Sequence, residues 1–341
     1  MNTLIRVVTF CGALSWAVVV GAEEFSPFQP LPPQPPIPAD NALSDDKVQL
    51  GRQLYFDRRL SFNQGLSCNS CHDLMAGGAD NRAAVSKGDV GRAAARSAPT
   101  LWNVAYQTVY FWDGRAASLE AALAEHLTSP TEMAMPDDKA LVERLSGAYS
   151  DQFERVFKKQ GEFNYQNITR ALASYIRTLV TTGSRFDRYL QGDGSAIPMQ
   201  AKQGYQRFID VGCASCHFWV NLSGPVPGLA FQMGEGFYEL FPNYPGTEEE
   251  GRYALAEDLG RYYITQDDKD RRMWRVPVLR NIALTAPYFH NGAVPTLDEA
   301  VRVMAITQLG VKLTAGEVED IVEFLKTLSG EFPPQPLPRL P

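Results

Sequence analysis

Two short segments of the chain place two cysteines and a histidine in the same order and at the same spacing. They are Cys68-Asn-Ser-Cys71-His72 and Cys213-Ala-Ser-Cys216-His217. This pattern is typical of covalent haem c attachment, in which both thiols add to the vinyl groups of the haem and the histidine binds the iron. We therefore predict two covalently bound haem c groups, with His72 and His217 as iron ligands.

An alternative use of these residues is disulfide bonding. The two motifs take up four of the five cysteines and two of the four histidines, and an exported chain could pair such cysteines in two disulfides. A disulfide framework gives no reason for a histidine directly after each pair, so haem attachment is the favoured interpretation. The chemistry of each haem then depends on the group that faces the iron from the other side.

Met304 is a candidate for that group at the second motif. With Leu297, Val301 and Gln308 it falls on one face of a predicted helix. A methionine in such a stripe is more often a core residue, but a thioether is also a suitable haem ligand that raises the potential of the iron. On the residues alone, both interpretations stay open.

The first 22 residues are typical of an export signal. One positive charge, Arg6, precedes an apolar run from Val7 to Val20, and cleavage after Ala22 fits the small residues there. The run is shorter than the ~20 residues of a membrane-spanning helix, which makes a retained anchor the weaker alternative. We expect export to the periplasm and no membrane insertion after cleavage. The net charge of −7 argues against nucleic acid or an anionic membrane as a partner.

The elements that must position the two motifs are predicted to be helices. Apolar residues at helical spacing, or capping residues, indicate helices in 44–56, after Ser118, in 168–179, 199–210 and 297–308, and from Thr314 to Gly330. Strands are expected to be few or absent. The fold class is therefore mainly α, with two cytochrome c-like helical haem domains and long ordered loops.

The predicted domain order follows from the motifs and from composition. We expect a signal peptide (1–22), a proline-rich linker (23–41), an N-terminal haem c domain (42–190), a C-terminal haem c domain (191–330) and a proline-rich tail (331–341). Residues 26–38 and the tail are expected to be extended and poorly packed, because proline-rich segments form no regular ladder.

From about residue 42 to residue 330 the chain resembles the bacterial dihaem cytochrome c peroxidases and the related methylamine dehydrogenase maturation enzyme MauG. The segments that carry the resemblance are 66–72 (LSCNSCH), 77–81 (GGADN), 99–103 (PTLWN), 111–116 (FWDGRA), 130–133 (PTEM), 211–217 (VGCASCH), 279–290 (LRNIALTAPYFH) and 308–310 (QLG). Their number and order make the resemblance far more specific than the two haem motifs alone.

The resemblance implies different roles for the two haems. The N-terminal haem reacts with peroxide and the C-terminal haem relays electrons, with Met304 as its second iron ligand. Trp112 matches a tryptophan that passes electrons between the haems, against the alternative of simple core packing, which is the interpretation kept for Trp102. Glu132 matches an acid–base residue of the peroxide site, whose pKa we expect to be raised by desolvation.

The function implied is reduction of hydrogen peroxide to water by electrons from a small periplasmic redox protein, a cytochrome c or a cupredoxin. Relatives favour a homodimer. They also imply a calcium ion bound by Asn103 and by the backbone carbonyls of Thr285 and Pro287, since oxygen ligands suit a hard cation. Two other functions stay open: a MauG-like oxidase that modifies a side chain of a partner protein, and a non-enzymatic dihaem electron carrier.

The sequence departs from the family pattern at two places. Many relatives carry a histidine in a loop that blocks the peroxidatic iron, but the matching residues 82–91 contain none, and Asp89 takes roughly that place. This favours an N-terminal iron that is open in the oxidised protein. His126, six residues before Glu132, is interpreted as a packing residue, a hydrogen-bond donor to peroxide or an alternative iron ligand. His290 is interpreted as a supporting residue near a haem edge or the calcium loop.

Overall fold

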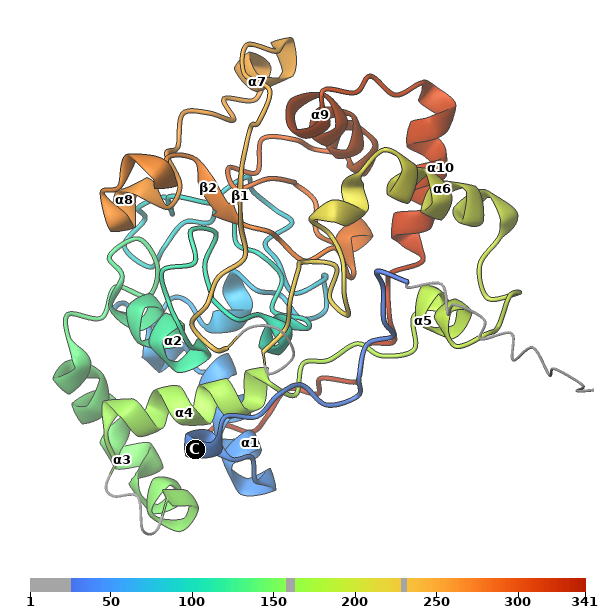
Figure 1. Cartoon of the computed structure of the whole chain (residues 1–341). Coiled ribbons are helices and arrows are strands. Elements are labelled where there is room, and N and C mark those ends of the chain that lie inside the picture. Colours follow the sequence, from blue (N-terminus) through green and yellow to red (C-terminus); the bar gives the residue numbers. More distant parts are fainter. Residues whose placement is uncertain (1–25, 158–162, 228–231) are drawn as a thin grey trace, which may run out of the picture.

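The structure is a computed structural model that describes residues 26–157, 163–227 and 232–341; the predicted signal peptide lies outside this range. The described part is mainly helical, as expected (Figure 1). Its α-helices are α1 (Asp45–Phe56), α2 (Leu119–Thr128), α3 (Asp138–Phe157), α4 (Tyr165–Ile176), α5 (Arg185–Leu190), α6 (Met199–Asp210), α7 (Glu248–Arg252), α8 (Tyr262–Thr265), α9 (Leu297–Leu309) and α10 (Ala315–Lys326). Strands β1 (Tyr238–Leu240) and β2 (Met273–Arg275) form one antiparallel pair.

Most helices begin where capping residues predict them. The side chain of Ser44 accepts a hydrogen bond from the Lys47 amide at the start of α1, and Thr314 and Glu317 form a reciprocal capping box at the start of α10. Helix α10 ends at Lys326, before the expected stop at Gly330. The longest helix, α3, has no counterpart among the expected segments, although its buried residues Leu141, Leu145, Tyr149, Phe153 and Phe157 recur every fourth position.

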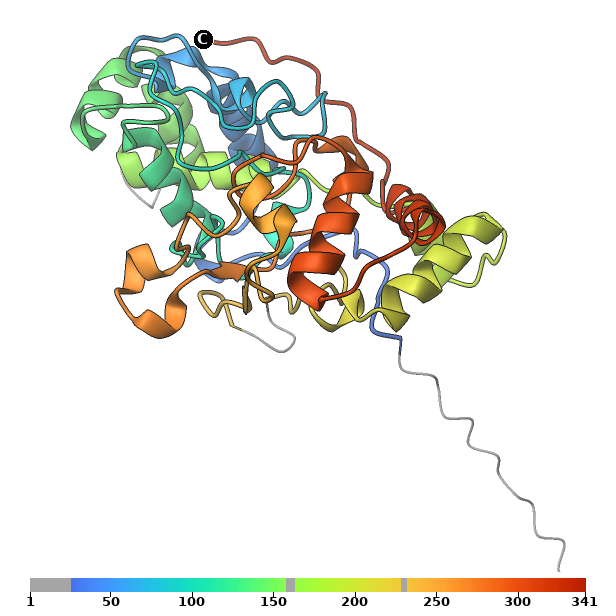
Figure 2. The same ribbon diagram turned by 90° about the horizontal axis from the view of Figure 1, so that it is seen from above.

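Most of the helices gather around the two largest hydrophobic clusters of the described residues. Helices α1 to α4 enclose the first core, which contains Leu54, Tyr149 and Leu172, and Figure 1 shows them together at one end of the molecule. Helices α5, α6 and α10 enclose the second, around Phe186 and Phe324. Long loops from both halves fill the space between the two helical groups (Figure 2). Within the described residues no helix combines the length and the apolar character needed to cross a membrane.

The same kind of helix crossing occurs in both halves. In the first, α1 crosses α4 at Gly51, where an added Cβ would lie 1.9 Å from the Ala171 carbonyl oxygen. In the second, α6 crosses α10 at Gly204, where an added Cβ would lie 1.8 Å from the Asp320 carbonyl oxygen. In each half the helix with this glycine precedes a Cys-x-x-Cys-His segment. The lack of a side chain lets the backbones approach closely and fixes the position of each motif.

We expect Gly51→Ala to lower the free energy of unfolding by about 1–3 kcal/mol, because its methyl group would force α1 away from α4. Urea denaturation of the haem-loaded protein, followed by far-ultraviolet circular dichroism, measures the change. The control is Gly147→Ala in α3, where an added Cβ meets no atom within 4 Å. This control should be neutral or stabilising by up to about 1 kcal/mol through helix propensity. Equal stabilities for the two variants would contradict the close crossing.

The proline-rich segment at 26–38 packs on the second core, which corrects the expectation of poor packing there, whereas most residues of the tail are exposed, as expected. Phe28 is 1% exposed and its ring makes edge contacts with Phe186 and Tyr205 in the second core. In the tail, Phe332 packs edge-on against Trp102, with ring centroids 4.9 Å apart. Figures 1 and 2 show the C-terminus beside α1. Composition indicated the extended backbone correctly, but the isolated aromatic residues insert into cores that belong to distant parts of the chain.

Candidate functional site

The two Cys-x-x-Cys-His motifs line two separate cavities. The N-terminal cavity has an empty volume of about 1440 Å³ and is lined by Cys68, Cys71, His72, His126 and Glu132, among others. The C-terminal cavity has an empty volume of about 1280 Å³. Its lining includes Cys213, Cys216, His217, His290 and Met304. Apolar side chains form most of both linings, which suits a large apolar cofactor.

Each motif begins with a short 3-10 turn and has a buried histidine held by a backbone carbonyl. Nδ1 of His72 lies 2.9 Å from the Pro99 oxygen, and Nδ1 of His217 lies 3.0 Å from the Leu222 oxygen. Because a carbonyl only accepts, Nδ1 carries the proton and Nε2 keeps its lone pair. Burial lowers the pKa of His72 to about 4 and also lowers that of His217, so both rings are neutral.

No disulfide joins the four cysteines of the two motifs, in keeping with haem attachment rather than the disulfide alternative. Burial raises the pKa of Cys68 and of Cys213 to about 12, which keeps both sulfurs protonated at neutral pH. Among the described residues no three histidine, cysteine or acidic side chains converge as they would around a directly bound metal ion. The donor set therefore matches a cofactor that brings its own metal and is bound through thioethers.

Unpaired polar groups in the cavity walls also fit such a cofactor. Arg275 lines both cavities, and no carboxylate in the described part of the chain forms an ion pair with it. Burial lowers the pKa of Arg275 only to about 10, so it stays a buried cation at neutral pH. In the C-terminal cavity Gln308 Oε1 and His290 Nε2 are buried without a hydrogen-bond partner. The acidic substituents of haem could balance the charge of Arg275.

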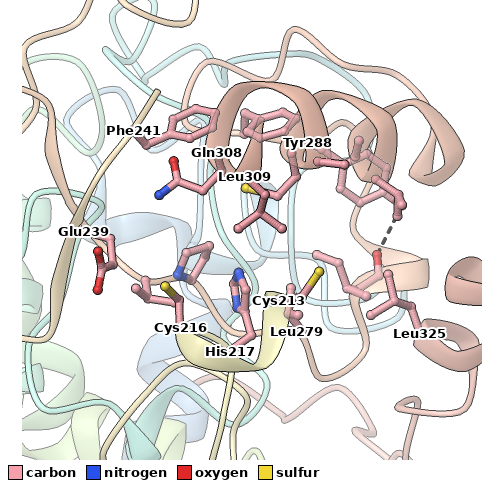
Figure 3. Close-up of a pocket in the computed structure, with 18 of the residues that line it drawn as sticks. Cys213, Cys216, His217, Glu239, Phe241, Leu279, Tyr288, Gln308, Leu309 and Leu325 are labelled. Carbon is pink, nitrogen blue, oxygen red and sulfur yellow. Dashed lines mark hydrogen bonds between the residues drawn. The ribbon is translucent and has the colours of Figure 1, made fainter. Parts of the chain in front are cut away.

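Met304 and the helical face predicted around it line the C-terminal cavity. Leu297, Val301, Met304 and Gln308 of α9 all contribute to its wall. Figure 3 shows Cys213, Cys216 and His217 at one side of this cavity, with Phe241 and Tyr288 across from them. The structure thus places Met304 and His217 around one space, as an axial pair requires. The role of Met304 as iron ligand stays a prediction.

The N-terminal cavity contains a histidine–carboxylate pair. Nδ1 of His126, at the end of α2, lies 2.6 Å from Oε2 of Glu132, in the turn that follows. Burial favours a higher pKa for Glu132, but the charges of His126 and Arg115 outweigh burial, and the pKa lies below its ordinary value. The expectation of a raised pKa was therefore wrong, because it considered desolvation without the neighbouring bases. Glu132 is a carboxylate at neutral pH.

An arginine and aspartate network beside this pair was not predicted from the sequence. Asp113 is buried and accepts hydrogen bonds from Arg96 at 2.5 Å and from Arg115 at 3.0 Å. Arg96 also contacts Asp258, and both arginines line the N-terminal cavity. Asp113 and Arg115 stand in the segment 111–116 that carries the family resemblance. That segment was the available signal, but their pairing depends on the sharp turn at Gly114.

Trp112 lies between the two cavities. Its side chain contributes to the lining of both, a property it shares with Arg275, and its indole N–H donates to the Ser97 carbonyl at 2.8 Å. Trp102 is 1% exposed and packs in the first core, in keeping with its interpretation as a core residue. His290 stacks on Trp274 with a centroid distance of 4.2 Å, in the wall of the C-terminal cavity. The position of Trp112 is compatible with electron transfer between the cavities.

The loop 82–91 packs on the turn that contains Glu132. The Asp89 amide donates to the Glu132 carbonyl at 2.8 Å. The Asp89 carboxylate accepts hydrogen bonds from the amides of Asn63 and Gly65, and Asp89 does not belong to the lining of the N-terminal cavity. The residue in the place of the expected loop histidine therefore bonds to backbone away from the cavity.

The residues proposed to bind calcium lie in two segments with different partners. Asn103 is fully buried; its Oδ1 accepts from the Thr181 amide and its Nδ2 donates to Thr181 Oγ1. Thr285 and Pro287 precede His290, whose carbonyl accepts from the Ser97 amide at 2.7 Å. The side chain of Asn103 thus bonds to Thr181, and one of the hydrogen bonds of the segment 285–290 joins it to Ser97.

Comparison with known proteins finds relatives that bind two haems, in agreement with the two cavities. The family model described as "Di-haem cytochrome c peroxidase" matches residues 45–195, and a model described as "RoxA-like, cytochrome c-like" matches residues 274–304. Cytochrome c551 peroxidase of Pseudomonas aeruginosa is 36% identical over 98% of this chain and 93% of that protein. Cytochrome c peroxidase Ccp of Escherichia coli is 40% identical over 90% of this chain and 62% of that protein.

A solved structure resembles this one over most of its length. A MauG-like protein associated with microbial copper homeostasis has a TM-score of 0.76 and 30% sequence identity, covering 88% of this chain and 93% of that chain. Paired haem motifs, two cavities joined by a tryptophan and sequence identity over nearly the whole length lead to one conclusion. The chain belongs to the bacterial di-haem cytochrome c peroxidase family.

Proposed function

We propose that the protein reduces hydrogen peroxide to water with electrons from a small soluble redox protein, a cytochrome c or a cupredoxin. The reaction consumes two electrons and two protons for each peroxide and yields two waters. The observation that carries the proposal is the asymmetry of the two cavities. Each has a motif histidine and two thiols, but the N-terminal cavity contains the hydrogen-bonded pair of His126 and Glu132, whereas Met304 of helix α9 lines the C-terminal cavity.

The residues that would hold the cofactors follow from the two motifs. Cys68, Cys71 and His72 would hold one haem c, and Cys213, Cys216, His217 and Met304 the other. When bound, haem supplies the iron that reduces peroxide in the first cavity and stores an electron in the second. The apolar linings keep bulk water from both cofactors.

Glu132 is positioned to move the protons. As a carboxylate it can take a proton from one peroxide oxygen and return it to the other, which the departing water needs. The Arg115 guanidinium lies in the same cavity, where its N–H groups can orient an oxygen. Asp113 fixes this guanidinium through two hydrogen bonds of 3.0 Å, so its orientation is set before peroxide enters.

Steady-state kinetics test the function. Haem-loaded protein is mixed with reduced cytochrome c and hydrogen peroxide, and oxidation of the donor is followed by absorbance. We expect two molecules of donor oxidised for each peroxide. No donor oxidation above the rate without protein, with a reduced cupredoxin as well as with cytochrome c, would refute the proposal. Peroxide consumption without donor oxidation would favour the MauG-like alternative, and no consumption would favour the electron carrier.

The MauG-like alternative has two observations in its favour. They are the 30% identity to the MauG-like structure and the absence of a histidine from the loop 82–91. Met304 in the wall of the C-terminal cavity supports the peroxidase instead. The resemblance implies a methionine as the second ligand of this iron in the peroxidases and a tyrosine in MauG.

Trp112 is proposed to pass electrons between the cavities. We expect Trp112→Phe to lower kcat for peroxide reduction by about tenfold or more, since phenylalanine is much harder to oxidise and cannot donate to Ser97. The haem content and the spectra of both haems should stay unchanged. The control is Trp102→Phe, which removes a more deeply buried indole outside the linings of both cavities. Equal turnover by wild type and Trp112→Phe would exclude the electron-transfer role.

Several further expectations are retained as proposals. We propose export to the periplasm through residues 1–22, a linker at 23–41, haem domains at 42–190 and 191–330, a tail at 331–341, and a homodimer. The two hydrophobic cores support the division into two haem domains. Calcium binding by the Thr285 and Pro287 carbonyls rests on the resemblance, and Asn103 would have to share its oxygen with the Thr181 amide.

A further inference from the structure

His126 faces the haem-binding histidine of the N-terminal cavity at a distance that limits what can lie between them. The ring centroids of His72 and His126 are 6.2 Å apart and the ring planes are nearly perpendicular, at 82°. Both side chains line the cavity that also receives Cys68 and Cys71. Both rings therefore border the part of the N-terminal cavity in which the iron held by His72 would lie.

The distance discriminates between two roles for His126. An imidazole nitrogen lies about 2.0–2.1 Å from a bound transition metal, so two rings that bind one ion from opposite sides have centroids roughly 6 Å apart. A histidine that instead held a metal-bound peroxide would add an oxygen and a hydrogen bond of about 2.8 Å, and the centroids would be roughly 8–9 Å apart. The observed 6.2 Å fits the first arrangement and leaves no room for peroxide.

His126 has a hydrogen bond at Nδ1, as the two motif histidines have, and this bond orients its ring. Its Nδ1 lies 2.6 Å from Glu132 Oε2, just as Nδ1 of His72 and of His217 lies 2.9 Å and 3.0 Å from a backbone oxygen. Glu132 as a carboxylate only accepts, so Nδ1 of His126 carries a proton, and it is the neutral form of the ring that has a lone pair on Nε2 for a metal ion. Metal-bound histidines almost always donate their other N–H in this way, and a carboxylate partner makes the ring a stronger ligand.

Neither the loop 82–91 nor Glu132 supplies a free ligand at this position. The loop 82–91 has no histidine, and the Asp89 carboxylate bonds to the amides of Asn63 and Gly65 outside the cavity. Glu132 is occupied by His126, and Phe111 packs on the other side of the His126 ring, with centroids 4.9 Å apart. The ring is thus held between Phe111 and Glu132 and directed at one place.

We propose that His126 binds the iron held by His72 in the oxidised protein, as its second axial ligand. This deepens the proposed function and rests on it: the N-terminal iron is closed at rest, and peroxide enters after His126 has left. The element that must move is the end of α2 with the turn from Ser129 to Glu132, and the loop 82–91 follows through the Asp89–Glu132 hydrogen bond. It replaces the expectation of an iron that is open in the oxidised state.

Spectra of the oxidised, haem-loaded protein test the proposal. Near-infrared magnetic circular dichroism distinguishes histidine–histidine from histidine–methionine ligation, and low-temperature electron paramagnetic resonance reports the spin state. For wild type we expect two low-spin ferric haems, one with each ligand pair. For His126→Gln we expect the histidine–histidine signals to be lost and one high-spin ferric haem to appear for each chain.

Two further samples control for damage to the site. Adding imidazole to His126→Gly should restore a low-spin haem, because the free base can fill the space of the lost ring. Glu125→Gln changes the preceding, exposed residue, whose carboxylate bonds to Arg115 and not to His126, and should keep the wild-type spectra. A haem content of two per chain in every variant shows that each has folded and matured.

The outcomes separate this proposal from the peroxidase function. A high-spin N-terminal haem in oxidised wild type, or spectra unchanged in His126→Gln, would overturn axial ligation by His126, even if peroxide turnover is normal. The expected spectra without donor oxidation would overturn the peroxidase function and leave the ligand assignment standing. If both hold, His126→Gln should react with peroxide in the oxidised state, where wild type does not.

Discussion

Replacing Glu132 by glutamine is expected to lower kcat for peroxide reduction by about 10²–10⁴-fold, the usual contribution of a positioned acid–base group. Glutamine keeps the size of the side chain and an oxygen that can accept from His126, but it cannot take up a proton. Oxidation of reduced cytochrome c by peroxide measures the loss. The haem content should be unchanged, because neither the cysteines nor His72 is altered.

Glu125→Gln is the matched control for this prediction. It makes the same change seven residues earlier, on an exposed residue of α2, and Arg115 keeps its two hydrogen bonds to Asp113. Its turnover should match wild type. A Glu132→Gln enzyme that retained full kcat would show that the protons of the reaction come from another group, and the role assigned to Glu132 would be withdrawn.

Removing the guanidinium of Arg280 is expected to cost about 3–5 kcal/mol of stability, as does loss of one partner of a buried ion pair. Arg280 and Asp187 are 1% and 3% exposed, and two hydrogen bonds of 2.8 and 3.0 Å join them. Arg280 also donates to the Val220 carbonyl, while Asp187 accepts from the Leu31 amide at 3.0 Å. Arg280→Ala would leave Asp187 charged and unpaired, and would loosen the N-terminal segment.

Urea unfolding of the haem-loaded protein measures this cost. Lys326→Ala provides the comparison: it breaks an ion pair with Glu323 at the surface, where the lysine side chain is 49% exposed, and should cost less than about 1 kcal/mol. An Arg280→Met, Asp187→Leu double variant should recover part of the stability, because it leaves no isolated charge. If Arg280→Ala and Lys326→Ala lowered the free energy of unfolding by similar amounts, burial of the Arg280–Asp187 pair would not increase its contribution to stability.

The two stability predictions describe how the fold positions the haem motifs. Gly51 and Gly204 set the spacing of the helix crossings, and the Arg280–Asp187 pair joins the segment after β2, helix α5 and the N-terminal segment that contains Leu31. A substitution at either place should therefore also weaken the packing of the haems, since the walls of the cavities come from the same helices and loops.

Part of this architecture could be predicted from local sequence signals. The caps at Ser44 and Thr314 and the apolar spacing of α4 and α9 act within a few residues, so the order of residues alone reveals them. Helix α3 shows the limit of such reasoning, because its apolar stripe was present but not recognised. The packing of Phe28 and Phe332 shows another limit, since a lone aromatic residue in a proline-rich segment carries no sign of its partner.

The sequence by itself determined the cofactor chemistry of this protein. Two thiols and a histidine within five residues form a complete attachment site, whose geometry is set by one turn of backbone. Only the tertiary structure decided what faces each histidine. Glu132 acquires a lowered pKa from His126 and Arg115, Trp112 comes to line both cavities, and His126 comes within 6.2 Å of His72 across 54 positions of the chain. These relations arise because side chains that are distant in sequence share one enclosed space, where separation and burial set their charges and their possible partners.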